Sequence, residues 1–494
     1  MVYAPGSVVI DDLPLAHALI STQRDRFCDG CLAESKDLSA CSACRQMFYC
    51  GRSCQRRMWP AHKIECKQYR ILKLLPVAQI RLLIRLLFLK DEGDKARLAN
   101  LVSHIQEFRA DSQFMSTFSV VLCTLSKFLS NALPTSESEI FRLYCQIQIN
   151  CFTITDRNGY QIAPAIFLNA ARLDHSCCPN SEYIFKERRL ICLAVDEIPN
   201  ITEARVNYVD PIASTEQRRS QLRSRYFFEC NCSLCLDLKR DAKITSFVCC
   251  EPEHLSTVVD SASLSTTTIV CPVCHTTYDR NLIQQIIEYL SAFNDKESTV
   301  ENVVDALLVY CRIRGIEVSL KYHTVVPVMD HNHTVYTGSV EAHYKLFNHK
   351  GSVYLTQVCR CASLGILPER TDDLFDTLGI RQDKELKDTV IDILIACSLD
   401  FLNWQSTYLP RLGFGVGLHA SNLAGFLLRY ISDSEFSSQG KMEQIKRTAV
   451  FAISESTLAH VLCRLILLAD KVLTPFSLYD PTIKDGLDRL RSHL

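Results

Sequence analysis

The chain has 494 residues, of which 22% are charged and 47% hydrophobic, with a net charge of −1 at pH 7. This composition is typical of a globular protein of two to four domains, and the balanced charge excludes a general attraction to nucleic acid or to a membrane surface. The longest apolar candidate for a membrane span, residues 458–473, contains four charged or titratable residues, and the first residues lack the pattern of a signal peptide. We therefore expect an intracellular protein without a membrane span. Its 25 Cys are then metal ligands or buried thiols.

The first predicted elements are a strand segment within residues 1–20 and a cysteine-rich segment at residues 24–70. The second segment contains eight zinc-type ligands with the spacing C-x2-C-x9-C-x2-C-x5-C-x3-C-x7-H-x3-C, enough for two tetrahedral sites. These ligands are Cys28, Cys31, Cys41, Cys44, Cys50, Cys54, His62 and Cys66. A segment this small cannot build its own core, so metal binding must supply its folding energy.

This spacing resembles the MYND zinc finger at every ligand. The resemblance implies interleaved ligand sets and a role in binding proline-rich peptides of partner proteins. One ion would be held by Cys28, Cys31, Cys50 and Cys54, and the other by Cys41, Cys44, His62 and Cys66.

The finger segment is basic, with ten Lys or Arg and five Asp or Glu between Arg24 and Arg70. Its cations form either a solvated face or a contact for an acidic peptide or, more weakly, for DNA. The cations concerned are Arg52, Arg56, Arg57 and Lys63.

Residues 71–140 have apolar residues at helical spacing, as in Ile80, Leu83, Ile84 and Leu87, and predict a helical segment. Residues 141–212 contain an N-x-F-x-I strand at 150–154, the run LDHSCCPN at 173–180, a hairpin at 183–195 and a strand RVNYVD at 205–210. Residues 213–240 end with the run YFFECNCSLC at 226–235, whose C-x-C-x2-C thiols need a fourth ligand to close a zinc site.

These motifs, in this order, resemble SET-domain lysine methyltransferases, and the inserted finger is typical of the SMYD family. The resemblance covers residues 1–240 well and the remainder loosely. It implies an α+β fold in which a β-rich SET core is split by the MYND finger and the helical insert, and is followed by a helical, TPR-like domain at residues 281–494.

The resemblance implies a protein-lysine N-methyltransferase that uses S-adenosylmethionine on histone or other protein substrates, a chromatin regulator of nucleus and cytoplasm. The implied catalytic residue is Tyr208, and Phe152 and Tyr226 would wall the lysine channel. The implied cofactor contacts are His104, Asn150, Asp174, His175, Tyr208 and Phe228. The implied zinc ligands after the SET core are Cys177, Cys230, Cys232 and Cys235.

Simpler interpretations exist for several of these residues. A Phe is more often part of a core than of a pocket, and a lone His beside a packed turn is usually structural, so we expect His175 to make cofactor and structural contacts without acid–base chemistry. The spacing alone does not decide between Cys177 and Cys178 as the fourth thiolate, and three cysteines can also lie together without a metal.

Two departures from the family pattern affect the cofactor site. Asp174 stands where the family has Asn, and a carboxylate cannot donate the hydrogen bonds of an amide. The sequence starts at what resembles the second strand, so we expect the glycine-rich G-x-G strand to be absent. The alternative function is therefore a catalytically impaired SMYD protein that acts as an interaction scaffold or transcriptional regulator, with a DNA-associated regulator as a weaker third.

Residues 241–280 form a Cys-containing linker with a possible fourth zinc site at Cys250, Cys271 and Cys274, to which His254 could add a ligand. From residue 281 onward apolar residues recur at helical spacing. The acidic run at 372–376 predicts the first turn of a helix.

Overall fold

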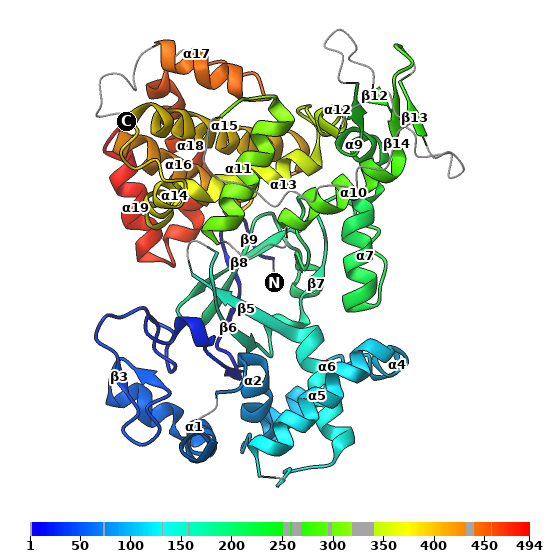
Figure 1. Cartoon of the computed structure of the whole chain (residues 1–494). Helices are drawn as coiled ribbons and strands as arrows, with labels where there is room; N and C mark the ends of the chain where they lie inside the picture. Colours follow the sequence, from blue (N-terminus) through cyan, green and yellow to red (C-terminus); the bar gives the residue numbers. More distant parts are fainter. Residues whose placement is uncertain are drawn as a thin grey trace. The chain divides into compact units, whose positions relative to one another are not determined.

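The computed structural model describes residues 2–494 except for 73–74, 131, 157–158, 250–256, 259–267, 272, 295–298, 319–339, 431–438 and 456. The chain divides into two compact units (Figure 1). The first comprises Met1–Val209 and Arg219–Cys230, and the second comprises Asp210–Arg218 and Asn231–Leu494.

The first unit is built on small sheets. Strands β1 (Val8–Asp12), β9 (Arg189–Ala194) and β8 (Ser181–Lys186) form one antiparallel sheet in the order β1-β9-β8. Strands β2 (Ala16–His17), β6 (Gln161–Ile166) and β5 (Cys151–Thr155) form a second in the order β2-β6-β5. Two pairs complete the set: β7 (Asp174–His175) with β10 (Arg205–Val206), and β3 (Ser39–Ala40) with β4 (Phe48–Tyr49).

Among the described residues, six α-helices lie wholly in the first unit: α1 (Arg52–Leu72), α2 (Ala78–Leu87), α3 (Glu92–Ala99), α4 (Ile105–Ala110), α5 (Ser112–Phe128) and α6 (Glu137–Asn150). Their starts follow local rules, because Asp111 caps α5 and Ser136 caps α6 by accepting backbone N–H hydrogen bonds. Helix α2 is central, since it packs against α1, α5, α6, β2 and β6 (Figure 1).

Two hydrophobic cores fill the first unit. One contains finger residues such as Met47 and Tyr69 together with Leu82 and Leu83 of α2 and Phe118 of α5. The other fills the space at the strands that carry the SET-like motifs. The finger therefore has no separate core: most of its buried apolar residues share one core with the helical insert, and Phe27 and Leu32 belong to the other.

The second unit is mainly helical. Its strands form the pairs β11 (Phe247–Val248) with β12 (Thr257–Val258) and β13 (Thr268–Val270) with β14 (Thr277–Asp279). Its helices are α8 (Ser233–Leu236), α9 (Leu238–Ile244), α10 (Arg280–Ser291), α11 (Val300–Arg314), α12 (Val340–Lys345), α13 (Val353–Ala362), α14 (Pro368–Thr377), α15 (Lys384–Tyr408), α16 (Phe414–Tyr430), α17 (Gln439–Thr448), α18 (Leu458–Ser477) and α19 (Pro481–Arg491). Helix α7 (Thr215–Tyr226) contains residues of both units.

Alternate helices of this unit pack on each other, α11 on α13, α13 on α15, α15 on α17, and α16 on α18. The prediction of a helix start at residues 372–376 is wrong, because α14 begins at Pro368. Proline suits the first helical position, where its missing N–H has no partner to lose.

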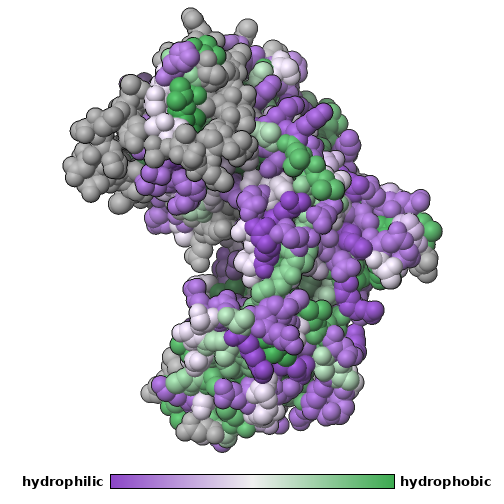
Figure 2. Space-filling model, turned by 90° about the vertical axis from the view of Figure 1, so that its right-hand side faces the viewer, coloured by the Kyte–Doolittle hydropathy of each residue, from purple (hydrophilic) through white to green (hydrophobic). Residues whose placement is uncertain are grey.

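The described residues thus form a mixed fold of helices and small sheets. None of their helices combines the length and apolarity that crossing a bilayer requires. On the face seen in Figure 2, hydrophilic residues cover most of the coloured surface, and hydrophobic residues form small groups among them.

Candidate active site and metal centres

The eight finger ligands form the two interleaved sets that the MYND resemblance implies. The ligand atoms of Cys28, Cys31, Cys50 and Cys54 lie within 4.8 Å of one another, and so do those of Cys41, Cys44, His62 and Cys66. All-thiolate and Cys3His donor sets of this size suit structural Zn²⁺. Helix α1 contributes to both sets, because it carries Cys54 as well as His62 and Cys66.

An arginine compensates the charge of the all-thiolate set. Four thiolates around Zn²⁺ leave a net negative charge, and Nη2 of Arg57 donates to Sγ of Cys54 at 3.1 Å. Arg57 therefore contacts a thiolate of this set, and Arg52, Arg56 and Lys63 are exposed on the same helix.

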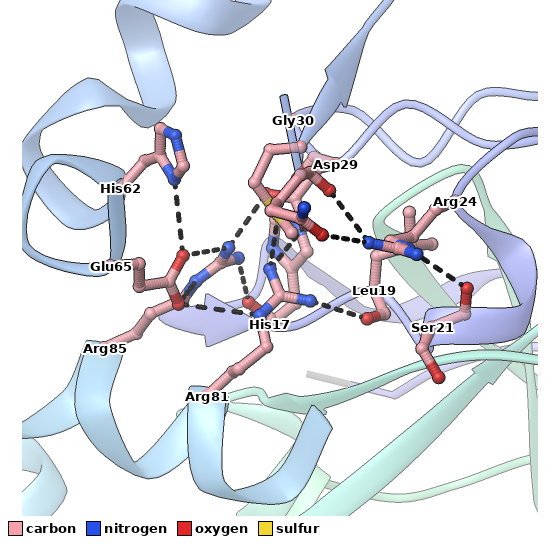
Figure 3. A network of polar contacts seen from close by, with 12 residues as sticks. His17, Leu19, Ser21, Arg24, Asp29, Gly30, His62, Glu65, Arg81 and Arg85 are labelled. Atoms are coloured by element: carbon pink, nitrogen blue, oxygen red, sulfur yellow. Dashed lines mark hydrogen bonds and ion pairs between the residues drawn. The ribbon is translucent and has the colours of Figure 1, made fainter. Parts of the chain in front are cut away.

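The Cys3His set of Cys41, Cys44, His62 and Cys66 has a neighbouring carboxylate where the all-thiolate set has an arginine. Nε2 of His62 lies 3.5 Å from Sγ of Cys44, and its Nδ1 faces Oε2 of Glu65 at 3.5 Å (Figure 3). A carboxylate on the far nitrogen fixes the orientation and tautomer of a zinc-bound imidazole.

Glu65 belongs to a buried ionic network that joins the finger to helix α2 and strand β2 (Figure 3). Arg85 donates to Glu65 Oε1 at 3.0 Å, to Asp29 Oδ2 at 2.8 Å and to the carbonyl of His17 at 2.5 Å. Arg81 donates to Asp29 Oδ1 at 3.0 Å and to the carbonyl of Leu19 at 2.8 Å. We define Asp29, Glu65, Arg81 and Arg85 as the finger–sheet network.

The four charged groups of this network are solvent-inaccessible or nearly so, and they balance each other. Burial alone would raise the pKa of Glu65 and of Asp29, but Arg85 and Arg81 reverse this and hold both pKa values below their usual range. Burial and the nearby Arg85 lower the pKa of His17 to about 4, so this residue is neutral at pH 7.

The SET-like motifs meet around Tyr208. Strands β7 and β10 pair in parallel, with Arg205 opposite Asp174 and Val206 opposite His175. The Tyr208 hydroxyl donates to the carbonyl of Leu173, and the Tyr208 N–H donates to Nδ1 of His175 at 3.0 Å. Because Nδ1 accepts, the proton of a neutral ring is on Nε2, which faces Sγ of Cys177 at 3.2 Å.

Both ring nitrogens of His175 are thus used inside the fold, which fits a structural role and leaves no free nitrogen for acid–base chemistry. Burial raises the pKa of Tyr208, with smaller contributions from Asp174 and Tyr226, so its hydroxyl stays protonated at neutral pH.

Aromatic rings surround this pair. The ring centre of Tyr226 lies 5.0 Å from that of Tyr208, and the Phe228 ring lies 5.9 Å from the His175 ring. The Phe152 ring contacts the Tyr183 ring at 5.5 Å, and Tyr208 packs against the same core as these two residues.

The other predicted cofactor contacts have different surroundings. The His104 ring lies against Phe227 at 5.1 Å, and its Nδ1 is 3.2 Å from Glu107. Both amide hydrogens of Asn150 are donated to the carbonyls of Val102 and Gln146, each at 2.8 Å, so its side chain offers a ligand only an oxygen.

Asp174 is accessible, with 74% of its side chain exposed, and its carboxylate lies 3.9 Å from Arg205. A carboxylate in this position could pair with a cationic ligand group, which is compatible with the ammonium of S-adenosylmethionine.

Two of the predicted zinc ligands after the SET-like core also meet, with Sγ of Cys177 and Sγ of Cys230 3.9 Å apart within the first unit. Cys232 and Cys235 follow Cys230 in the chain and belong to the second unit. Nη2 of Arg218 lies 3.5 Å from Sγ of Cys235, which repeats the pairing of an arginine with a thiolate seen in the finger.

Sequence reasoning missed Tyr183 and the finger–sheet network. Tyr183 lies in the predicted hairpin, and the alternation of strand side chains could have placed it on the same side as Phe185. Arg81 and Arg85 could have indicated the network, because they are four residues apart and therefore lie on one face of the otherwise apolar helix α2.

Comparisons with known proteins agree with these features. The MYND finger family matches residues 28–66. The chain is similar to the N-lysine methyltransferase SMYD2-A of Xenopus laevis, with 30% identity over 52% of this chain and 62% of that protein. It is also similar to the histone-lysine N-methyltransferase SMYD3 of Homo sapiens, with 29% identity over 48% of this chain and 58% of that protein.

The matched region therefore spans about three fifths of the length of these relatives. The MYND finger, the metal-ligand sets and the similarity to these methyltransferases all agree with the resemblance of the chain to the SMYD family.

Proposed function

We propose that this chain is a protein-lysine N-methyltransferase that uses S-adenosylmethionine. The observation that carries the proposal is the double anchoring of Tyr208, whose hydroxyl is held by Leu173 and whose backbone is held by His175. Both anchors come from the one segment that resembles the SET-domain motif. The similarity to SMYD2 and SMYD3 supports the same assignment.

The donor would supply a methyl group on a sulfonium. The Tyr208 hydroxyl hydrogen is committed to Leu173, so its oxygen keeps lone pairs that can accept weak C–H···O contacts and an amine hydrogen. The raised pKa of Tyr208 makes it an orienting group and not a base.

The aromatic residues around Tyr208 would act on the lysine. A lysine amine that leaves water for a site walled by Tyr226 and Phe152 loses hydration, which lowers its pKa and increases the neutral, nucleophilic fraction. A narrow site also aligns the amine with the methyl group, which removes much of the entropic barrier.

The residues present fit the donor in part. Phe228 offers a ring face, Asn150 an acceptor oxygen, and Asp174 an accessible carboxylate. His104 would contribute through its ring, because its Nδ1 lies near Glu107.

The alternative is a catalytically impaired SMYD scaffold. The observation that favours it is Asp174, whose exposed carboxylate replaces the amide of the family and lies near Arg205. Protein partners would then bind through the finger, where Trp59 is 45% exposed beside Arg56 on helix α1. Binding of proline-rich peptides or DNA by this surface stays a proposal.

Calorimetric titration of the zinc-loaded chain with S-adenosylmethionine separates the two functions. The enzyme predicts saturable binding at one site per chain and methyl transfer to a lysine-containing protein. If millimolar S-adenosylmethionine gives no heat of binding and does not raise the thermal midpoint of the chain, the methyltransferase proposal is refuted and the scaffold remains.

A further inference from the structure

The two C-x2-C turns of the finger share one backbone geometry. The N–H of the residue after the second cysteine donates to the carbonyl of the first: Leu32 to Cys28, and Arg45 to Cys41, both at 2.9 Å. These two residues have positive φ angles, 60° for Leu32 and 55° for Arg45. The N–H of Cys28 also donates back across the turn, to the carbonyl of Ala33 at 3.0 Å.

A third turn, in the second unit, repeats this geometry. The N–H of His275 donates to the carbonyl of Cys271 at 3.0 Å, and His275 has a φ of 58°. The N–H of Cys271 donates back to the carbonyl of Thr276 at 2.9 Å. The turn joins strands β13 and β14, as C-x2-C turns do in zinc ribbons.

The repeated angle has a cost. A left-handed conformation is unfavourable for a residue with a β-carbon, by about 1–2 kcal/mol, and it persists where surrounding interactions impose it. In the finger, the turn aims two thiolates at one metal ion. The same conformation at His275, with no glycine in the position, indicates that the Cys271 turn is shaped for the same task.

A third thiol completes the argument. Cys249, which follows strand β11, brings its Sγ to 3.4 Å from Sγ of Cys274, and the Sγ atoms of Cys249, Cys271 and Cys274 all lie within 4.8 Å of one another. Ligands of a tetrahedral zinc–thiolate site lie about 3.8 Å apart, given a Zn–S bond of about 2.3 Å. Cys249 and Cys271 are buried and Cys274 is half-buried.

We propose that Cys249, Cys271 and Cys274 bind a structural Zn²⁺ ion in the second unit, separate from the finger ions. The ion would tie the end of β11 to the β13–β14 hairpin that leads into helix α10. Three thiolates leave one position of the tetrahedron for water or a further ligand. The sequence suggested Cys250 and His254 as further ligands of this site, and both lie outside the described residues. Among the described residues, the third thiol beside Cys271 and Cys274 is that of Cys249.

A redox pair is the competing explanation for the short distance between Cys249 and Cys274. Their Sγ atoms are 3.4 Å apart, well beyond the ~2.05 Å of a disulfide bond. Oxidation would join these two thiols and release the metal, so the two explanations predict different metal contents.

The test is the zinc content of the full-length chain, measured by mass spectrometry of the metal after exhaustive dialysis. We expect Cys274→Ser to contain one zinc equivalent less than the wild type, and Cys463→Ser, which changes an exposed thiol on α18, to contain the same amount as the wild type. The difference between variants is the readout, so the occupancy of the finger sites does not affect it.

A second variant separates metal binding from misfolding. Cys274→His keeps a zinc-binding side chain, and we expect it to restore the lost equivalent and the thermal midpoint. Equal zinc in wild type and Cys274→Ser would overturn the proposal. The proposal would also be overturned if a disulfide joined Cys249 and Cys274 in all molecules of the wild type, purified without reductant and alkylated before analysis.

Discussion

Tyr208 has two anchors that act on different atoms. The hydroxyl bond to Leu173 sets the ring, and the N–H bond to His175 sets the backbone. A change that removes only the hydroxyl therefore leaves the backbone anchor in place.

For Tyr208→Phe we expect methyl transfer to fall about 100-fold, as misplacement of reacting groups does, while the free energy of unfolding drops by about 1 kcal/mol, the value of one hydrogen bond. Steady-state methylation assays and denaturant unfolding measure the two effects. Tyr479→Phe, in the other unit, is the control. Unchanged turnover in Tyr208→Phe would remove the orienting role of the hydroxyl.

At this scale the sequence was informative where chemistry demands one residue type at a fixed spacing. The finger ligands and their interleaved sets could be read from the spacing and the resemblance, because zinc tolerates few alternative donors. The sequence could not show that both nitrogens of His175 are used inside the fold. Their partners are Cys177 and the backbone of Tyr208, and the pairing of β7 with β10 brings them together.

At the scale of elements, the finger–sheet network decides how helix α2 meets the finger. Removing one member leaves an opposite charge buried without a partner, which costs more than an exposed ion pair contributes. The loss of Glu65 also removes the carboxylate that faces His62.

We expect Glu65→Gln to lower the free energy of unfolding by about 3 kcal/mol and to weaken zinc binding by about tenfold or more. Glu34→Gln, which breaks the exposed pair with Arg26, should change stability by about 0.5 kcal/mol or less. Guanidinium unfolding and the rate of zinc transfer to a chelator are the two measurements. Equal behaviour of the two variants would contradict the role of the network.

A buried carboxylate in the second unit predicts a pH effect. Burial raises the pKa of Asp392 on helix α15 to about 6, although Lys441 lies 3.3 Å away and opposes the shift. When the pKa of an acid is higher in the folded state than in the unfolded state, the folded state binds the proton more tightly. The free energy of unfolding therefore increases as the pH falls through the pKa of the folded state.

The wild type should therefore gain about 1 kcal/mol relative to Asp392→Asn between pH 7 and pH 5. Thermal unfolding of both chains at the two pH values gives this difference, and shared effects of other groups cancel in it. Glu443→Gln, which breaks an exposed pair with Lys446, should show no such difference from the wild type. A wild-type gain no larger than that of Asp392→Asn would show that Asp392 is ionised throughout.

The errors at this scale have physical causes. The acidic run at 372–376 resembled a first turn, but the helix had already begun at Pro368, which suits the first helical position, and Glu369 is the acidic residue of its first turn. Long-range contacts were invisible as well: Gln357 donates to the carbonyl of Ile212 at 3.1 Å, and Arg360 pairs with Asp210. Such contacts assign residues 210–218 to the second unit.

At the scale of the whole molecule, the two units provide an internal comparison. The residues proposed for the donor and the lysine all belong to the first unit: His104, Asn150, Phe152, Asp174, His175, Tyr208, Tyr226 and Phe228. Helices α15 to α19 belong to the second.

We therefore expect S-adenosylmethionine to slow hydrogen exchange in the segments 150–154, 173–176 and 205–209, and to leave α16 and α18 unchanged. At a hundredfold excess over Kd the gain is about 2.7 kcal/mol for the unit that binds it. Exchange measured by mass spectrometry with and without donor tests this. Protection confined to the second unit would place the donor outside the proposed site.

The finger–sheet network also bears on how chimeric proteins should be designed from this family. A swap limited to residues 24–70 would leave Arg81 and Arg85 facing whatever the new finger provides, and a donor finger without acids at the positions of Asp29 and Glu65 would strand two cations in an apolar interior. The transplantable piece is therefore the finger together with the helix that holds its counter-charges.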